Sequence, residues 1–161
     1  MAWAQPAGEY QVKAVFLFRF AQFVEWPPEV FSDAQAPIVI GVLGEDPFGG
    51  FLDEAVAGER VNRRPLEVRR YRRMDEIGGC HILFIAESEE ARLEQILGRL
   101  KGRAILTVGD SDGFARRGGM IRFVEEKNRI RFRVNASATR AAHLVISSKL
   151  LRSSSVIGGQ N

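Results

Sequence analysis

The sequence predicts a single α/β domain, a sandwich in which helices flank both faces of one mixed β-sheet of about five to six strands. Three observations support this prediction. The length of 161 residues suits one domain of ordinary size. The contents of 45% hydrophobic and 27% charged residues are those of a folded chain rather than a disordered one. Short apolar runs bounded by turn residues also alternate with segments of helical pattern.

The first element is the most apolar stretch of the chain, residues 12–26. It predicts a helix buried over most of its circumference, because Gln11, Arg19 and Gln22 share one narrow polar stripe. The run is too short and too charged to cross a bilayer, which takes about 20 apolar residues. Two interpretations remain open: the helix lies deep in the core, or it covers a partner subunit.

A strand, a tight turn and a helix follow. Residues 38–43 form a continuous apolar run, which is typical of a strand covered on both faces. Asp46 is placed to cap a helix and Pro47 to be its first residue, so a helix is expected from there to about Ala57.

The middle of the chain continues the alternation. Residues 65–71 predict a half-exposed strand and residues 81–86 a buried one. Ser88 is the expected cap of a helix over residues 89–100, and residues 104–108 predict another buried strand.

The last third predicts a β-hairpin and a helix. Residues 120–124 and 130–134 both alternate apolar with basic side chains, as in a hairpin with one solvated face. One helix is expected afterwards, capped by Asn135 or Ser137 and running to about Leu151.

The sequence offers little for catalysis. Cys80 is the only cysteine and the chain has two histidines, so an internal disulfide, a cysteine metal cluster and a histidine-rich metal site are excluded. Cys80 and His81 adjoin on a strand and point to opposite faces, which favours a half-buried structural thiol over a nucleophile. No catalytic residue, metal site or cofactor is predicted.

A small ligand, if one binds, is expected beyond the carboxyl ends of the strands, where open α/β sheets hold their ligands. In this chain those ends are the turns at residues 44–48 and 109–114. The polar candidates in the turns are the carboxylates Glu45, Asp46 and Asp110. The cations that we assign to an anionic ligand are Arg19, Arg116 and Arg152.

Charge is concentrated in one segment. Residues 60–73 hold seven arginines and one acid, Glu67, although the net charge of the chain is only +3. Arginine binds carboxylates and phosphates in a planar fork, so this segment is either a solvated face or a surface for an acidic partner, an anionic ligand or nucleic acid. Nucleic acid is disfavoured, because no recognition helix or exposed aromatic residues accompany the arginines. The expected contact residues are Arg63, Arg64, Arg69, Arg70, Arg72 and Arg73.

Six blocks of sequence run in order along almost the whole chain. They are EYQVKAVFLFRFAQFVEWP at 9–27, IGVLGEDPFG at 40–49, HILFI at 81–85, LTVGD at 106–110 with GF at 113–114, GGMI at 118–121 and ISSKLL at 146–151. Together these blocks resemble the YfiR-like family.

The resemblance implies a non-enzymatic regulator in the periplasm that acts in cyclic-di-GMP signalling. The name-giving member restrains an inner-membrane diguanylate cyclase by binding its periplasmic sensory domain, and an outer-membrane lipoprotein relieves the restraint. The expected partner is therefore the periplasmic domain of such a cyclase or of a sensor kinase, with the lipoprotein and a homodimer as further associations. The alternative is a periplasmic small-molecule-binding sensor domain.

The resemblance also bears on the chain ends and on Cys80. It makes Ala2-Trp3-Ala4 credible as the remnant of a signal peptide. We therefore expect a tail over residues 1–8, the YfiR-like domain over 9–154 and a second tail over 155–161. The cyclase-restraining member senses redox state through several cysteines, whereas Cys80 alone could act only through an intermolecular bridge.

Overall fold

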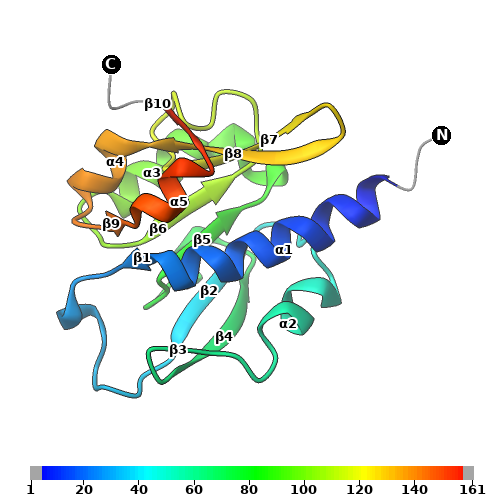
Figure 1. Cartoon of the computed structure of the whole chain (residues 1–161). Helices are drawn as coiled ribbons and strands as arrows, with labels where there is room; N and C mark the ends of the chain where they lie inside the picture. The colour runs from blue at the N-terminus through cyan, green and yellow to red at the C-terminus, as the bar shows by residue number, and fades with distance from the viewer. Residues whose placement is uncertain (1–4, 158–161) are drawn as a thin grey trace.

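The computed structural model describes residues 5–157, and its centre is a mixed β-sheet (Figure 1). The strands of this sheet are β2 (Ile38–Leu43), β3 (Arg60–Val61), β4 (Arg64–Tyr71), β5 (Ile82–Ile85), β6 (Leu106–Gly109), β7 (Ile121–Glu126), β8 (Arg129–Asn135) and β10 (Ser155–Ile157). Their order is β10-β8-β7-β6-β5-β2-β4-β3. The sheet has more strands than the sequence predicts because the short β3 and β10 extend its two edges.

The middle of the sheet is parallel. Strands β4, β2, β5, β6 and β7 run in the same direction, and β8 returns antiparallel to β7. The residues of β2, β5 and β6 are all buried, as their continuous apolar sequences predict. The chain passes from β2 to β4 on one side and then to β5 on the other, so the order of strands reverses at β2.

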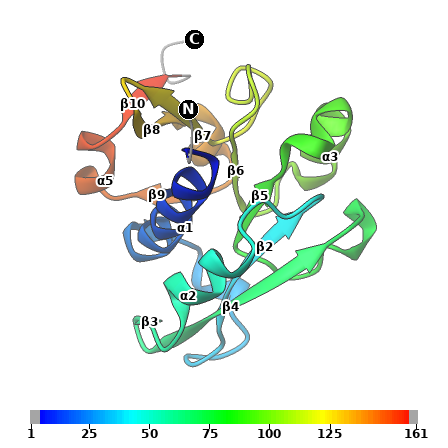
Figure 2. The ribbon, with the colours of Figure 1, turned by 90° about the vertical axis from the view of Figure 1, so that its right-hand side faces the viewer.

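Helices cover both faces of the sheet, which confirms the predicted α/β class. They are α1 (Gln5–Phe23), α2 (Gly50–Val56), α3 (Leu93–Leu100), α4 (Ala136–Ala141) and α5 (Ser148–Arg152), with 3₁₀ turns η1 (Pro28–Val30), η2 (Met74–Glu76) and η3 (Glu87–Arg92). Figure 2 shows α1, α2 and α5 on one side of the sheet and α3 on the other. Two apolar clusters result, a larger one under α1 and a smaller one under α3.

Helix α1 crosses the sheet with one face inward (Figure 1). Leu17 and Phe20 of α1 are fully buried, and the ring of Phe20 packs edge-to-face on that of Phe132 with centroids 5.2 Å apart. Its outer stripe keeps Val12 45% and Val15 48% exposed. Of the two interpretations, the core placement is therefore confirmed, and a narrow apolar stripe remains on the outside.

Helix α2 begins later than predicted. Asp46 does not cap a helix at Pro47, because its Oδ1 accepts a hydrogen bond from the backbone N–H of Phe48 and closes a tight turn there. Gly49 then takes φ +55°, and the helix begins at Gly50.

Helix α3 is also shorter than expected. Residues Glu87–Arg92 form a 3₁₀ segment, and the α-helix starts only at Leu93. Ser88 does not cap it, because its Oγ accepts a hydrogen bond from the backbone N–H of Glu45 instead. The hydroxyl thus links the ends of β5 and β2.

The prediction of a single helix near the C-terminus is wrong. Asn135 caps α4 as predicted, through a hydrogen bond from the backbone N–H of Ala138, but α4 ends at Ala141. His143 follows with φ +63°, and Val145–Ile146 forms β9, which pairs antiparallel with β1 (Val24–Glu25). This pairing ties the chain to the end of α1 before α5 begins.

The hairpin of β7 and β8 is confirmed. Lys127 and Asn128 turn it with φ of +51° and +62°, the conformation of a two-residue turn that suits the twist of the strands. At the chain ends, α1 begins at Gln5, and Ser155–Ile157 adds β10 parallel to β8. The Ala2-Trp3-Ala4 triplet lies outside the described residues.

Candidate functional site

The edge where a ligand was expected does contain hollows. Strands β2, β5 and β6 all end there, at the point where the strand order reverses. Two shallow crevices of about 350 and 330 Å³ lie along this edge and share Tyr10 and Glu87 in their linings. Glu45 lines the first crevice and Asp110 the second.

Asp110 is committed to an internal contact. Its Oδ2 accepts hydrogen bonds from the Tyr10 hydroxyl at 2.5 Å and from the Lys13 Nζ at 2.8 Å. Lys13 is only 3% exposed, and its Nζ also pairs with Glu9 and lies 4.4 Å from the centroid of the Tyr10 ring. Burial, and then the bond to Asp110, raises the pKa of Tyr10, so its hydroxyl stays a neutral donor. The group ties α1 to the end of β6.

Tyr10 and Lys13 were missed as site residues. The signal that could have found Lys13 is a charge on the apolar side of the helix, away from the stripe of Gln11, Arg19 and Gln22, because a buried charge needs a partner. Its partner lies 97 positions away in the chain, at the end of a strand. The sequence pattern therefore indicates that Lys13 needs a partner, but it does not identify Asp110 as that partner.

Asp46 is likewise engaged inside the molecule. Arg70 reaches it with Nε at 2.7 Å, and reaches Asp53 of α2 with a terminal nitrogen at 2.8 Å. The same guanidinium donates to the carbonyl of Gly49 at 3.0 Å. Hydrogen bonds to Asp53 and Asp46 raise the pKa of Arg70. Arg70 and Asp46 therefore fasten the turn before α2 to strand β4, and of the three predicted carboxylates Glu45 is the exposed one.

The three arginines assigned to an anionic ligand line neither crevice. Arg19 is exposed on α1, nine residues and so about 13 Å along the helix from Tyr10. Arg116 is exposed in the loop between β6 and β7, and Arg152 on α5. The structure thus places the predicted carboxylates near the predicted edge and distributes the predicted cations over other elements.

The arginine segment divides into internal and surface residues. Arg64 is internal: its Nη1 donates to the carbonyls of Asp33 at 2.7 Å and Ala36 at 3.0 Å. Its guanidinium also lies 3.7 Å from the centroid of the Phe31 ring. Arg64 is half-buried and stabilises the loop next to β4, whereas Arg70 is exposed and is held by its ion pairs with Asp46 and Asp53.

The remaining predicted contact residues lie along or next to the outer edge of β4. Strand β3 pairs only with Arg64 and Pro65, so Leu66 to Tyr71 have no strand partner on that side within the described residues. Arg70 is exposed too but is held by Asp46 and Asp53; the other exposed arginines among the predicted contact residues are Arg63, Arg69, Arg72 and Arg73, which we call the basic edge. Arg69 pairs with Glu67 at 2.7 Å and Arg73 with Asp75 at 3.4 Å, both in solvent-exposed positions where such pairs are weak.

The comparisons with known proteins fit this geometry. A family model described as YfiR/HmsC-like matches residues 10–155. The chain belongs to the YfiR/HmsC-like family. No match was found among curated proteins. Membership confirms the resemblance read from the sequence blocks, and it indicates a periplasmic regulator of diguanylate cyclase signalling rather than an enzyme.

Within residues 5–157, no helix is long and apolar enough to span a bilayer.

Cys80 occupies a structural position in this member of the YfiR/HmsC-like family. Its side chain is 4% exposed, so it is more deeply buried than expected, within the apolar cluster under α3. Burial raises the pKa of the thiol to about 11, which keeps it protonated at neutral pH. His81 beside it is buried too, and its Nδ1 accepts a hydrogen bond from the backbone N–H of Val39 at 3.0 Å.

Proposed function

We propose that this protein restrains a membrane signalling protein, a diguanylate cyclase, by binding its periplasmic sensory domain through the basic edge. Membership of the YfiR/HmsC-like family supports the class of partner. The observation that carries the proposal is the outer edge of β4, where an unpaired run of backbone groups from Leu66 to Tyr71 lies among exposed arginines.

Both features of this edge favour a protein partner. Alternate N–H and C=O groups of an edge strand point away from the sheet and can pair with an extended segment of another chain. The arginines around them favour a segment rich in carboxylates, and charge complementarity raises the association rate. The expected occupant is therefore an acidic segment of the sensory domain.

To restrain the cyclase, the protein must bind the inactive and the active arrangements of the sensory domain with different affinities. The protein can hold the cyclase inactive only if it binds the inactive arrangement of the sensory domain more tightly than the active one. A single surface on a rigid sheet edge suits this task, because it can match one arrangement of the partner and not the other.

The test compares two sets of charge reversals in a binding titration with the purified periplasmic domain of a cyclase from the same organism. One variant carries Arg69→Glu, Arg72→Glu and Arg73→Glu. The matched control carries Arg129→Glu, Arg140→Glu and Arg152→Glu, which change the net charge equally at exposed positions on β8, α4 and α5.

We expect the first variant to bind at least about tenfold more weakly and the control to change affinity by less than about threefold. Circular dichroism establishes that both variants are folded. Equal losses in the two variants would show that only net charge matters, and unchanged binding of the first would remove the basic edge from the interface.

A small-molecule sensor is the second candidate function. The crevices at the carboxyl edge favour it little, because Asp46 and Asp110 are engaged by internal partners there. The observation that favours it lies elsewhere, in a cavity beside α3.

A further inference from the structure

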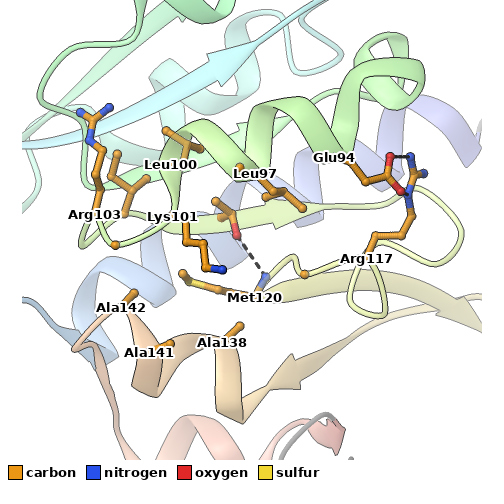
Figure 3. Close-up of a pocket in the computed structure, with 15 residues that line it drawn as sticks. Glu94, Leu97, Leu100, Lys101, Arg103, Arg117, Met120, Ala138, Ala141 and Ala142 are labelled. Carbon is orange, nitrogen blue, oxygen red and sulfur yellow. Dashed lines mark hydrogen bonds and ion pairs between the residues drawn. The ribbon is translucent and has the colours of Figure 1, made fainter.

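A cavity of about 480 Å³ runs alongside α3 (Figure 3). Its walls are α3, the start of β6, the segment before β7, and α4. Ligand sites in proteins commonly measure about 300–1,000 Å³, so this cavity could hold a small organic molecule. It is separate from the carboxyl-edge crevices and from the basic edge.

The cavity exists because two apolar clusters meet there without filling the space. Leu100 and Ile105 belong to the cluster under α3, and Met120 to the cluster under α1. Helix α4 and the residue that follows it close the cavity with small side chains, which Figure 3 shows pointing toward it: Ala138, Ala141 and Ala142. Larger residues on α4 would occupy the space.

The floor of the cavity is apolar with one polar group. Leu97, Leu100, Ile105 and Met120 supply aliphatic surface. The Oγ1 of Thr107 accepts a hydrogen bond from the backbone N–H of Met120 at 3.1 Å. No acceptor for the hydroxyl proton of Thr107 is found within residues 5–157, so this group is able to donate to a ligand.

Within residues 5–157, two cations around the cavity have no carboxylate partner, and one of these two, Lys101, makes no side-chain hydrogen bond either. At one end, Arg117 pairs with Glu94 at 2.6 Å. At the other end, Arg103 donates to the carbonyl of Gly78 at 2.9 Å. Lys101 lies between them with its ammonium over the cavity (Figure 3), and across the described part of the chain no carboxylate or carbonyl contacts it.

We propose that this cavity binds a small organic anion with a compact aliphatic body, which lies on Leu97, Ile105 and Met120 while its carboxylate meets Lys101. The cation and the apolar walls each select one part of such a ligand. Lysine at the C-terminal end of a helix also complements the helix dipole, so the test separates binding from stability. The proposal holds whether or not the basic edge binds a cyclase.

The probes are adamantane-1-carboxylate and its neutral counterpart adamantane-1-carboxamide, titrated into the purified protein by calorimetry. Methyl resonances of Leu97, Leu100, Met120 and Ala138 report the place of binding by NMR. We expect the carboxylate to bind with a dissociation constant below about 1 mM and the amide about fivefold more weakly. The shifts should centre on the cavity methyl groups.

Three variants make the result decisive. Lys101→Met should weaken the carboxylate about fivefold and leave the amide unchanged, whereas Lys149→Met, a matched change on α5, should affect neither. Ala138→Leu should fill the cavity and abolish binding of both probes. If Ala138→Leu fails to fold, Ala141→Leu at the exposed rim takes its place.

The proposal is overturned if the carboxylate shows no saturable binding or if the two probes bind equally. It is also overturned if the cavity-filling variants bind as well as the parent, or if the NMR shifts lie elsewhere. The proposal is overturned as well if the cavity methyl resonances shift only when a partner domain is added. The cavity would then be part of a protein interface. Thermal unfolding of each variant separates lost binding from lost stability.

Discussion

At the scale of single residues, Phe114 shows what the glycines of the loop before β7 do. Its ring is fully buried against the backbone of Gly109 and Gly119. A Cβ atom at Gly109 would lie 2.6 Å from the ring, and one at Gly119 only 2.1 Å from it. These glycines therefore fix the loop by close packing, which accounts for Gly109 in the LTVGD block and Gly119 in the GGMI block.

Gly119→Ala should destabilise the protein for this reason. The added methyl group cannot fit unless the Phe114 ring or the backbone moves, and overpacking of this kind costs about 1–3 kcal/mol. Urea unfolding measures the loss. Gly98→Ala is the control: its Cβ meets no atom within 4 Å on α3, so it should stabilise the helix by about 0.5–1 kcal/mol. Equal effects of the two substitutions would contradict the packing argument.

His81 makes the stability depend on pH. Burial lowers its pKa below the ordinary value of 6.5, and protonation of Nδ1 would break the hydrogen bond from Val39. The unfolded chain then binds the proton more readily than the folded one. The stabilisation is thus complete above pH 6.5 and is lost as the pH falls below it.

We therefore expect the free energy of unfolding to decrease between pH 7 and pH 5, measured by urea denaturation. His81→Gln should flatten this dependence, and His143→Gln, at an exposed position, should leave it as it is. If the free energy of unfolding of His81→Gln still decreases between pH 7 and pH 5, other titratable groups cause the pH dependence. Glu76 and Glu94, whose pKa values are lowered by hydrogen bonds, act only at lower pH.

At the scale of elements, helix α1 is fixed at two places. Its apolar face packs on the sheet, and near its middle the buried Lys13 binds Asp110 at the end of β6. At its C-terminal end, β1 pairs with β9. The helix thus links the carboxyl edge of the sheet to the C-terminal segment.

Lys13→Met should destabilise the protein by about 3 kcal/mol, because it leaves the carboxylate of Asp110 buried beside Tyr10 without its cation. Adding Asp110→Asn should restore part of the loss, since no buried charge then remains. Urea unfolding of the single and double variants gives both values. Arg69→Met, which breaks an exposed pair, should cost less than about 1 kcal/mol. A loss for Lys13→Met no larger than that would show that the buried pair contributes little.

At the scale of the whole molecule, stability should decrease from the middle of the sheet to its edges. Strands β2 and β5 have strand neighbours on both sides and apolar cover on both faces, whereas β3 and β10 are short edge strands. Local opening costs most where burial is greatest.

Amide hydrogen exchange should therefore be slowest in β2 and β5 and fastest in β3 and β10. The outward N–H groups of β4 should exchange quickly in the isolated protein and slow when the partner domain binds. Protection of β10 equal to that of β2 would contradict the expected gradient. Unchanged exchange in β4 on partner binding would contradict the proposed interface.

Much of the central fold follows from local pattern. The buried runs that became β2, β5 and β6 and the alternating runs of β7 and β8 were predicted, because strand faces depend on near neighbours. The helix starts near Asp46 and Ser88 were wrong, because each side chain bonds a turn or another strand end instead of a helix. Glu45, the partner of Ser88, lies 43 positions away and is absent from the local pattern, whereas Asp46 forms a local turn that competes with the helix cap.

The sequence by itself determined the α/β class, the buried strands, the family and the concentration of arginine. Only the tertiary structure decided which charges have partners: it paired Lys13 with Asp110, bound Arg64 and Arg70 to neighbouring loops and turns, and left Arg69 exposed on an open strand edge. It also created the cavity between α3 and α4. The physical reason is that apolar periodicity records burial along one element, whereas ion pairs, edges and cavities arise where elements distant in sequence meet.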